Sequence, residues 1–274
     1  MERVKKIVQE LRSRSKPVTE EEIINAVREY LQVLVLKIIF QSKFGTALSF
    51  MGGTCLRICH DLKRYSEDLD FCLDVPVGEY RFSSLVSVVQ KELELRGFSL
   101  SVNFQEDKIV QKAFFRFGNF SETLNLRGFR KDQKLHIKLE LDVNPPRLKK
   151  EERESFFVNR FQEIFPILKH NLPTLFAGKI LAILGRPFTR GRDYYDLIWY
   201  LSRKISPNVD YLNRGLKEGR FEKLDDVFEA LGKKVDTVKP EIILKDIGHF
   251  LEDPSEETWI RDYQKLYRQL VSQY

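Results

Sequence analysis

Two short stretches of the chain place pairs of carboxylates where they could act together. In one, Asp68 and Asp70 alternate with leucine and phenylalanine, and in the other Glu140 and Asp142 alternate with leucine and valine. Residues i and i+2 of a strand point the same way, so each pair presents two carboxylates side by side. Closely packed like charges repel and need a neutralising partner. If the two strands are neighbours, the acids suit Mg²⁺ (or Mn²⁺) bound together with substrate phosphates, where metals activate an attacking oxygen and steady a leaving pyrophosphate.

The same alternation is also typical of an antiparallel strand with one solvated face, so it needs support from elsewhere in the chain. Gly52-Gly53-Thr54 follows a short apolar stretch at 48–51 and predicts a strand, a tight turn and then a short helix. Glycine lets a phosphate approach the backbone, and the amides of a helix N-terminus favour anions. Glycine pairs are common in tight turns, and the sequence contains no Walker A, G-x-G-x-x-G or G-x-S-x-G motif.

The elements around these residues divide the chain into an α+β N-terminal half and a helical C-terminal half. Thr19 and Glu22 form a capping box that opens a helix over about 19–41. A second helix over about 80–96 ends at Gly97, a good residue to follow a helix C-terminus. Strands are expected near 48–51, 68–74, 98–105, 110–118 and 137–143, with a further candidate near 122–127. Later helices are expected at 173–185, 191–204, 208–217, 221–232, 239–251 and 256–273.

Composition excludes several other classes of protein. The chain has 274 residues, 42% hydrophobic and 31% charged, which is enough for a core and unlike a disordered tail or a disulfide miniprotein. Its 46 basic and 40 acidic residues leave a net charge of +6, which suits a polyanionic partner. Three cysteines without zinc-ligand spacing indicate a reducing compartment. No secretory signal is recognised, and no run reaches the roughly twenty apolar residues of a membrane span, so a cytoplasmic protein without a membrane partner is expected.

A second group of candidate residues lies on two predicted helices of the C-terminal half. Lys179 and Arg186 share one helix face, and Arg192, Asp193 and Asp196 open the next helix. The lysine and an arginine could neutralise triphosphate oxygens, as cations do in phosphoryl transfer. The two aspartates could orient Lys179 or take part in the chemistry. The alternative is a helix hairpin held by ordinary Lys–Asp and Arg–Asp pairs.

The first group of motifs resembles the signature of the DNA-polymerase-β-like nucleotidyltransferases, and more closely that of the AbiEii/AbiGii toxin family. That family's motif reads roughly G-G-T-x-L-R-x-x-x-x-x-x-R-x-S-x-D-L-D-F. It is matched by Gly52, Gly53, Thr54, Leu56, Arg57, Arg64, Ser66, Asp68, Leu69, Asp70 and Phe71. One departure is Asp61, where the family more often has glycine. A second block, A-x-K-x-x-A-x-x-x-R and then G-R-D-x-Y-D, is matched by Ala177, Lys179, Ala182, Arg186, Gly191, Arg192, Asp193, Tyr195 and Asp196.

The resemblance implies a fold and a set of roles. The fold is a polymerase-β-like nucleotidyltransferase core, a mixed sheet with flanking helices over 1–148, followed by an all-helical domain over 149–274 that contributes its Lys/Arg/Asp block to the active site. Asp68 and Asp70 would bind Mg²⁺ with a third carboxylate, either Asp142, which is favoured, or Glu140. A lysine and an aspartate of the second block are needed for activity in the family, and they correspond to Lys179 and to Asp196 or Asp193. The NTP would be bound by Gly52, Gly53, Thr54, Arg64, Ser66, Lys179, Arg186 and Arg192.

The resulting hypothesis is a metal-dependent nucleotidyltransferase that moves NMP from an NTP to an acceptor hydroxyl and releases pyrophosphate. The resemblance implies the toxin of a toxin–antitoxin or phage-defence pair, with an RNA acceptor such as tRNA and a cognate antitoxin as partner. Two alternatives are open. One is a nucleotidyltransferase acting on a small molecule or a protein side chain, and the other is a catalytically inactive interaction module of the same fold.

Overall fold

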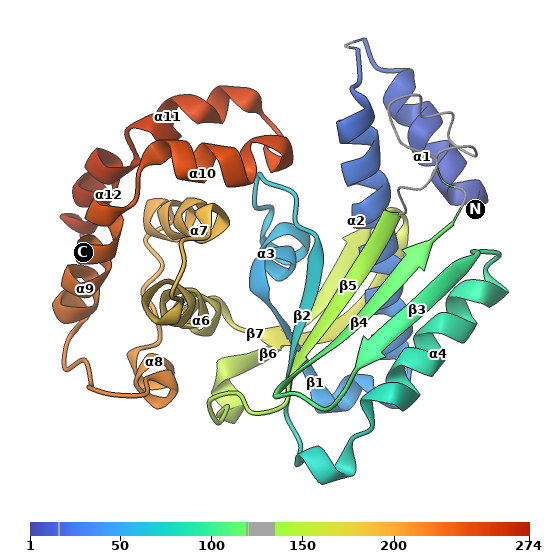
Figure 1. The fold of residues 1–274 in the computed structure, drawn as a ribbon, viewed down its shortest axis with the longest axis horizontal. Coiled ribbons are helices and arrows are strands. Elements are labelled where there is room, and N and C mark those ends of the chain that lie inside the picture. The colour runs from blue at the N-terminus through green and yellow to red at the C-terminus, as the bar shows by residue number, and fades with distance from the viewer. Residues whose placement is uncertain (16, 119, 121–134) are drawn as a thin grey trace. The chain divides into compact units, whose positions relative to one another are not determined.

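The chain folds into two compact units, which are described separately. The structure is a computed structural model that describes residues 1–15, 17–118, 120 and 135–274 (Figure 1). The first unit comprises Met1–Asp61, Tyr65–Asn144 and Ser155–Lys169, and the second comprises Leu62–Arg64, Pro145–Glu154 and His170–Tyr274. The strand considered near 122–127 lies outside the described residues.

A mixed sheet forms the centre of the first unit (Figure 1). Its strands are β1 (Leu48–Met51), β2 (Asp68–Leu73), β3 (Leu100–Gln105), β4 (Val110–Phe117), β5 (Leu135–Asp142), β6 (Arg153–Arg160) and β7 (Glu163–His170). Among the described residues the sheet has seven strands in the order β3-β4-β5-β2-β1-β7-β6. β2 runs parallel to β5 and β1 runs parallel to β7, whereas β1–β2, β3–β4 and β4–β5 are antiparallel. The predicted mixed sheet is confirmed.

Helices cover one face of this sheet. α2 (Glu20–Gln41) packs on β5, α4 (Phe82–Leu95) packs on β3 and β4, and the two helices contact each other (Figure 1). The predicted capping box opens α2, since the Glu22 amide donates to Thr19 Oγ1 at 3.2 Å and the Thr19 amide donates to Glu22 Oε2 at 2.7 Å. α1 (Glu2–Arg12) lies against α2, and α3 (Gly52–His60) follows β1 and contacts β1 and β2.

The predicted domain boundary between residues 148 and 149 does not separate the two units, because most of the β6–β7 hairpin that follows it belongs to the first unit. Ser155–Lys169 belongs to the first unit, because the hairpin extends the sheet beside β1. Its two-residue turn, Phe161-Gln162, has φ angles of 54° and 66°. Turns of this kind are usually encoded by Asn-Gly or a similar pair. Neither residue is glycine or asparagine, so the sequence gives no hairpin signal at this point.

The second unit is helical from residue 172 onward, as predicted. Its helices are α6 (Leu172–Gly185), α7 (Gly191–Ser202), α8 (Val209–Gly215), α9 (Leu224–Thr237), α10 (Pro240–Ile247), α11 (Glu257–Arg261) and α12 (Tyr263–Val271). α7 contacts α6, α10 and α12, and α6 also contacts α8 and α9. Short 3-10 helices occur at Gly45–Ala47, Val77–Glu79, Lys150–Glu152, Gly248–Phe250 and Pro254–Glu256. In the part of the chain that the structure describes, no helix combines the length and apolarity needed to cross a bilayer.

Candidate active site

The two strands that carry the paired carboxylates are direct neighbours. In the parallel β2–β5 pair, Asp70 is opposite Glu140 and Cys72 is opposite Asp142. Residues directly opposite each other on adjacent strands share a face of the sheet. Leu69, Phe71 and Leu73, which alternate with the acids along β2, point to the other face of the sheet, where they are buried. The four predicted acids, including Asp68, therefore lie on the sheet face opposite to the buried apolar one.

The two candidates for the third carboxylate have different surroundings. Glu140 lies 2.8 Å from Lys138 Nζ and 3.1 Å from Lys112 Nζ. Burial disfavours its charge, but the two lysines together outweigh burial and lower its pKa. Asp142 accepts a hydrogen bond from the Asn144 amide at 2.9 Å, and burial raises its pKa above the ordinary value. Among the described residues, Glu140 is thus neutralised by two ammonium groups, whereas Asp142 has no cation of its own.

The donor chemistry of this face fits a hard divalent cation that binds together with a substrate. No group of three or more His, Cys, Asp or Glu side chains within the described ranges is arranged to hold a metal ion alone. Mg²⁺ is commonly held by one or two carboxylates plus substrate phosphates. Asp68 and Asp70 provide two carboxylates at i and i+2, both partly exposed. These oxygen donors fit a cation whose remaining ligands come from a triphosphate.

The glycine turn lies beside β2, called here the D-x-D strand because it carries Asp68 and Asp70. Gly52 is next to the Asp70 carboxylate. Met51 is opposite Asp70 in the β1–β2 ladder, so the turn begins beside that carboxylate. Gly52 has a φ of 79°, which favours glycine, and a Cβ at this position would overlap the Asp70 carboxylate. Met51 gives α3 no side-chain cap, and the N-terminal amides of a helix favour anions. Thr54 is buried and donates its hydroxyl to the carbonyl of Asp68, which joins α3 to the start of β2.

Polar side chains of α2 hold the segments that lead into the D-x-D strand. Glu29 accepts a hydrogen bond from Arg57 Nε at 2.9 Å, and both side chains are buried. Gln32 Nε2 donates to the carbonyl of Ser66 at 2.9 Å. Sequence reasoning did not single out Glu29 or Gln32. With Asn25 they form a polar stripe at i, i+4 and i+7 among the buried apolar residues of α2, and that stripe is the signal that could have identified them.

Arg160 of β6 fastens the other end of α3. Its guanidinium donates to the carbonyls of Arg57 and Ile58, each at 3.1 Å, and it pairs with Asp61. Glu29 lies 3.5 Å away from the same guanidinium. Asp61 is the C-cap of α3 and has a φ of 56°, in the left-handed region that favours glycine. This conformation accounts for the glycine that the resembling motif more often has at this position.

In the second unit, Lys179 of α6 lies between two aspartates of α7. Its Nζ is 2.7 Å from Asp193 Oδ1 and 2.8 Å from Asp196 Oδ2, and Arg186 also pairs with Asp193. Burial disfavours the charge on both carboxyls, but the surrounding cations outweigh it, so the pKa of each aspartate lies below its ordinary value. Four of the residues singled out in the helical half are therefore brought into one ionised cluster.

Arg64 and Arg192 have other contacts within the second unit. Arg64 forms two bonds to Asp196, Nε to Oδ1 at 2.7 Å and Nη2 to Oδ2 at 2.6 Å, and its side chain is 2% exposed. The amide of Arg192 donates to Asp246 at 3.0 Å, and its guanidinium lies 5.0 Å from the Phe250 ring. The sequence predicts that both arginines bind the nucleotide, and the structure shows both engaged with protein groups.

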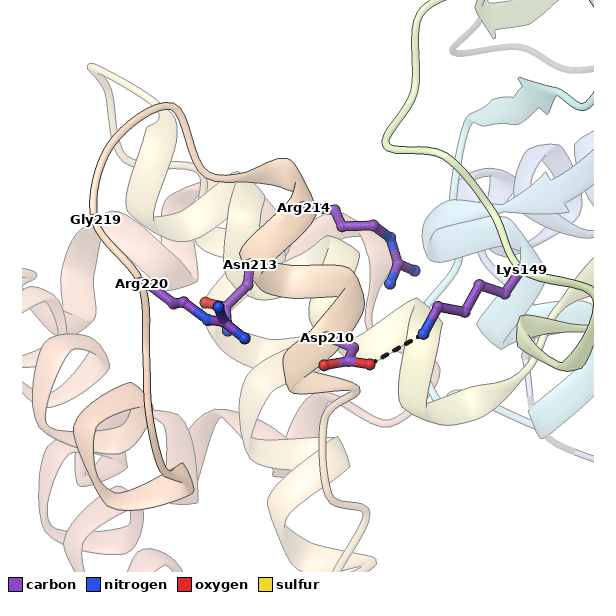
Figure 2. Close-up of a pocket in the computed structure, with 6 residues that line it drawn as sticks. All are labelled: Lys149, Asp210, Asn213, Arg214, Gly219 and Arg220. Carbon is purple, nitrogen blue, oxygen red and sulfur yellow. Dashed lines mark hydrogen bonds and ion pairs between the residues drawn. The ribbon is translucent and has the colours of Figure 1, made fainter.

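The second unit also carries an open hollow of about 400 Å³. It is lined by Lys149, Asp210, Asn213, Arg214, Gly219 and Arg220 (Figure 2). Lys149 Nζ pairs with Asp210 at 3.1 Å, and Arg214 is pinned by Glu152. None of the residues that the sequence singled out lines this hollow.

Comparison with known proteins identifies a family and a set of folds. A family model described as nucleotidyl transferase AbiEii toxin, type IV toxin–antitoxin system, matches residues 34–273. Among solved structures, JHP933 from Helicobacter pylori aligns with a TM-score of 0.56 and 16% identity, over 94% of this chain and 96% of that chain. MenT4, a nucleotidyltransferase toxin from Mycobacterium tuberculosis, aligns with a TM-score of 0.53 and 17% identity, over 97% and 88%. At these identities the two structures show the fold alone. No curated protein matches the sequence.

Proposed function

Because the chain belongs to the AbiEii family of nucleotidyltransferase toxins of type IV toxin–antitoxin systems, we propose that it transfers NMP from an NTP to a hydroxyl of RNA, with a divalent cation, Mg²⁺ or Mn²⁺. The observation that carries this proposal is that Gly52 lies against the Asp70 carboxylate. A turn without a side chain, at the uncapped start of a helix, adjoins one of two carboxylates that face the same way. Triphosphate and cation need these two features together.

The first unit supplies the groups that act on the phosphates. Gly52 and Gly53 let the triphosphate approach the first amides of α3, while Ser66 lies on the loop that Gln32 holds. Asp68 and Asp70 hold the cation, with Asp142 as the third carboxylate because its charge is not neutralised by a lysine. The cation, when bound, withdraws charge from the α-phosphate and offsets the charge of the leaving pyrophosphate.

The reaction is a displacement at the α-phosphorus. The acceptor hydroxyl oxygen forms a bond to that phosphorus, and the bond from phosphorus to the oxygen bridging the β-phosphate breaks. Pyrophosphate leaves with that bonding pair, and the hydroxyl proton passes to a carboxylate oxygen of the same sheet face. The protein aligns and neutralises these groups, which is the main contribution of enzymes to transfers at phosphorus.

The cluster in the second unit is assigned to phosphate oxygens. Three cations, Lys179, Arg186 and Arg64, are opposed by two aspartates, so the cluster keeps one positive charge. Arg186, at 31% side-chain exposure, and Lys179, at 12%, are the accessible members. Asp193, Asp196 and Arg64 are positioning groups that fix the lysine.

The net charge of +6 agrees with an RNA acceptor, and the resemblance to the family implies tRNA in particular. The family implies a cognate antitoxin as partner, and the same ground supports a role in phage defence. A small molecule or a protein side chain is the competing acceptor.

The test incubates the purified protein with Mg²⁺ and each α-labelled NTP in turn, with total tRNA present or absent. An Asp70→Asn variant, which still folds by circular dichroism, serves as the control. Label that becomes ribonuclease-sensitive, and that is absent with the variant or with EDTA, is the expected result. Label in protein or in small molecules would contradict the RNA acceptor and retain the chemistry. Absence of both transfer and NTP binding would overturn the proposal.

A further inference from the structure

The strands beside the catalytic carboxylates continue their face with a different kind of side chain. In the β4–β5 ladder, Lys112 is opposite Glu140, Phe114 is opposite Lys138, and Arg116 is opposite His136. Lys138 is in turn opposite Asp68 in the β2–β5 ladder. One row across the sheet therefore runs from Asp68 through Lys138 to Phe114. We call Lys112, Phe114, Arg116, His136 and Lys138 the basic strip.

Among the described residues of the first unit, the basic strip lies on the sheet face opposite to the one on which α2 and α4 pack. The residues that alternate with it, Ala113, Phe115, Ile137 and Leu139, are fully buried. They belong to the strands on which α2 and α4 pack. The members of the strip are partly exposed, with 41% for the side chain of Lys112 and 21% for that of Lys138. Phe114 is thus an aromatic residue on the solvated face of a strand whose other face already forms the core.

The cations of the strip outnumber the carboxylates paired with them. Lys112 and Lys138 share Glu140, at 3.1 and 2.8 Å, and Lys138 also lies 3.8 Å from Asp68, so these two lysines balance two carboxylates and Arg116 adds one excess positive charge. Arg116 and the imidazole of His136 lie in the next row, farther from Asp70. Cations arranged in this way attract a polyanion toward the carboxylates and hold it at its phosphates.

Phe114 is flanked by two cations and an imidazole ring. The Arg116 guanidinium lies 5.4 Å and the Lys138 ammonium 5.9 Å from the centroid of its ring, and the His136 ring lies 6.2 Å away. A partly exposed aromatic ring on a sheet, flanked by cations, is the combination on which single-stranded nucleic acids stack their bases. An acidic protein segment would pair with the cations alone and would not stack on the Phe114 ring.

We propose that the basic strip binds the single-stranded end of the acceptor RNA, with a base stacked on Phe114 and the adjoining phosphates held by Arg116 and His136. Two strand spacings, about 10 Å, separate Phe114 from Asp68 in their row, so a base stacked on the ring lies close to the carboxylates. The identity of the ligand as the acceptor rests on the proposed function. The assignment of the strip to single-stranded RNA is tested by binding alone.

The experiment titrates a fluorescently labelled single-stranded RNA oligonucleotide with the full chain and follows its anisotropy without NTP. Phe114→Leu keeps an apolar side chain and removes the ring, so its affinity should fall about 5- to 100-fold. Phe114→Tyr should keep wild-type affinity. Arg116→Gln should weaken binding and lower the slope of log affinity against log salt by about one. The affinity of Phe114→Leu for NTP, measured by calorimetry, should match that of the wild type.

Arg220→Gln is the matched control, because it removes one exposed arginine from the hollow of the second unit (Figure 2). If it weakens RNA binding as much as Arg116→Gln, binding reflects overall charge and the proposal is overturned. Unchanged affinity in Phe114→Leu, or no binding by the wild type, overturns it as well. RNA binding that depends on Phe114 without any nucleotidyl transfer would support the strip and refute the proposed function. Transfer to RNA that is unchanged in Phe114→Leu would support the proposed function and refute the role of the strip.

Discussion

Arg64 and Asp196 form a buried, two-pronged ion pair in which both guanidinium–carboxylate bonds measure 2.7 Å or less. Arg64 precedes Asp68 by four residues in the chain, and Asp196 is also bonded to Lys179 at 2.8 Å. The pair thus fixes the carboxylate that holds Lys179, and it does so from the segment that leads into the D-x-D strand.

Asp196→Asn is expected to lower the free energy of unfolding by about 3–5 kcal/mol, because it leaves the Arg64 guanidinium buried without its anion. Urea unfolding measures this loss. The control is Glu229→Gln, which breaks an exposed pair with Lys233 of similar length, 2.8 Å, and should change stability by less than about 1 kcal/mol. Equal losses in the two variants would show that burial of the Arg64–Asp196 pair is not what matters.

Gly52→Ala is expected to lower the rate of transfer by about 100-fold or more, because the new methyl group displaces the Asp70 carboxylate. The unfavourable φ of 79° adds to the effect. Gly78→Ala is the matched change in the same unit, at a site where a Cβ meets no atom within 4 Å, and it should retain activity. Steady-state transfer rates compare the two. If the Gly52→Ala variant were active, the glycine turn would not be part of the active site.

Asp142→Asn and Glu140→Gln distinguish the two candidates for the third carboxylate. Because Glu140 is neutralised by Lys112 and Lys138 whereas Asp142 is not, Asp142→Asn should cost on the order of 10³-fold in transfer, and Glu140→Gln much less. Transfer rates as a function of Mg²⁺ concentration provide the measurement. The opposite order of the two variants would assign the role to Glu140, which the register places beside Asp70.

Stability should fall in acid because of Asp193 and Asp196. Their pKa values in the folded protein lie below the ordinary 3.8, since Lys179, Arg186 and Arg64 outweigh burial. A carboxyl with a lowered folded pKa contributes stability above its unfolded pKa and loses it as the pH falls through the folded value. The free energy of unfolding should therefore decrease below about pH 4, and Asp193→Asn should flatten this decrease. Identical slopes for the variant and the wild type would contradict the assignment.

The elements with strong local signals could be predicted from the sequence. The capping box of Thr19 and Glu22 predicts the start of α2, and the alternation around Asp68 and Asp70 predicts β2. The glycine pair predicts the turn into α3. The β6–β7 hairpin could not be predicted, because its turn takes a left-handed conformation without glycine or asparagine. Tertiary pairing with β1 holds it in place instead.

The candidate site shows the same division. Spacing identifies which side chains share a strand or helix face, so Asp68 with Asp70 and Lys179 with Arg186 could be grouped in advance. It does not show which charges are already paired. The burial of Arg64 against Asp196, and the two lysines on Glu140, depend on contacts between segments far apart in the chain. Those contacts show that Arg64 is already paired with a protein carboxylate, which its position in the motif does not reveal.

The most direct test of nucleotidyl transfer compares one NTP labelled at the α-phosphate with the same NTP labelled at the γ-phosphate, in the presence of Mg²⁺ and RNA. The account predicts that the α-label enters the RNA, that the γ-label appears only in pyrophosphate in equal amount, and that Asp68→Asn abolishes both. Transfer of the γ-label to RNA or protein would reveal phosphoryl transfer and contradict the account.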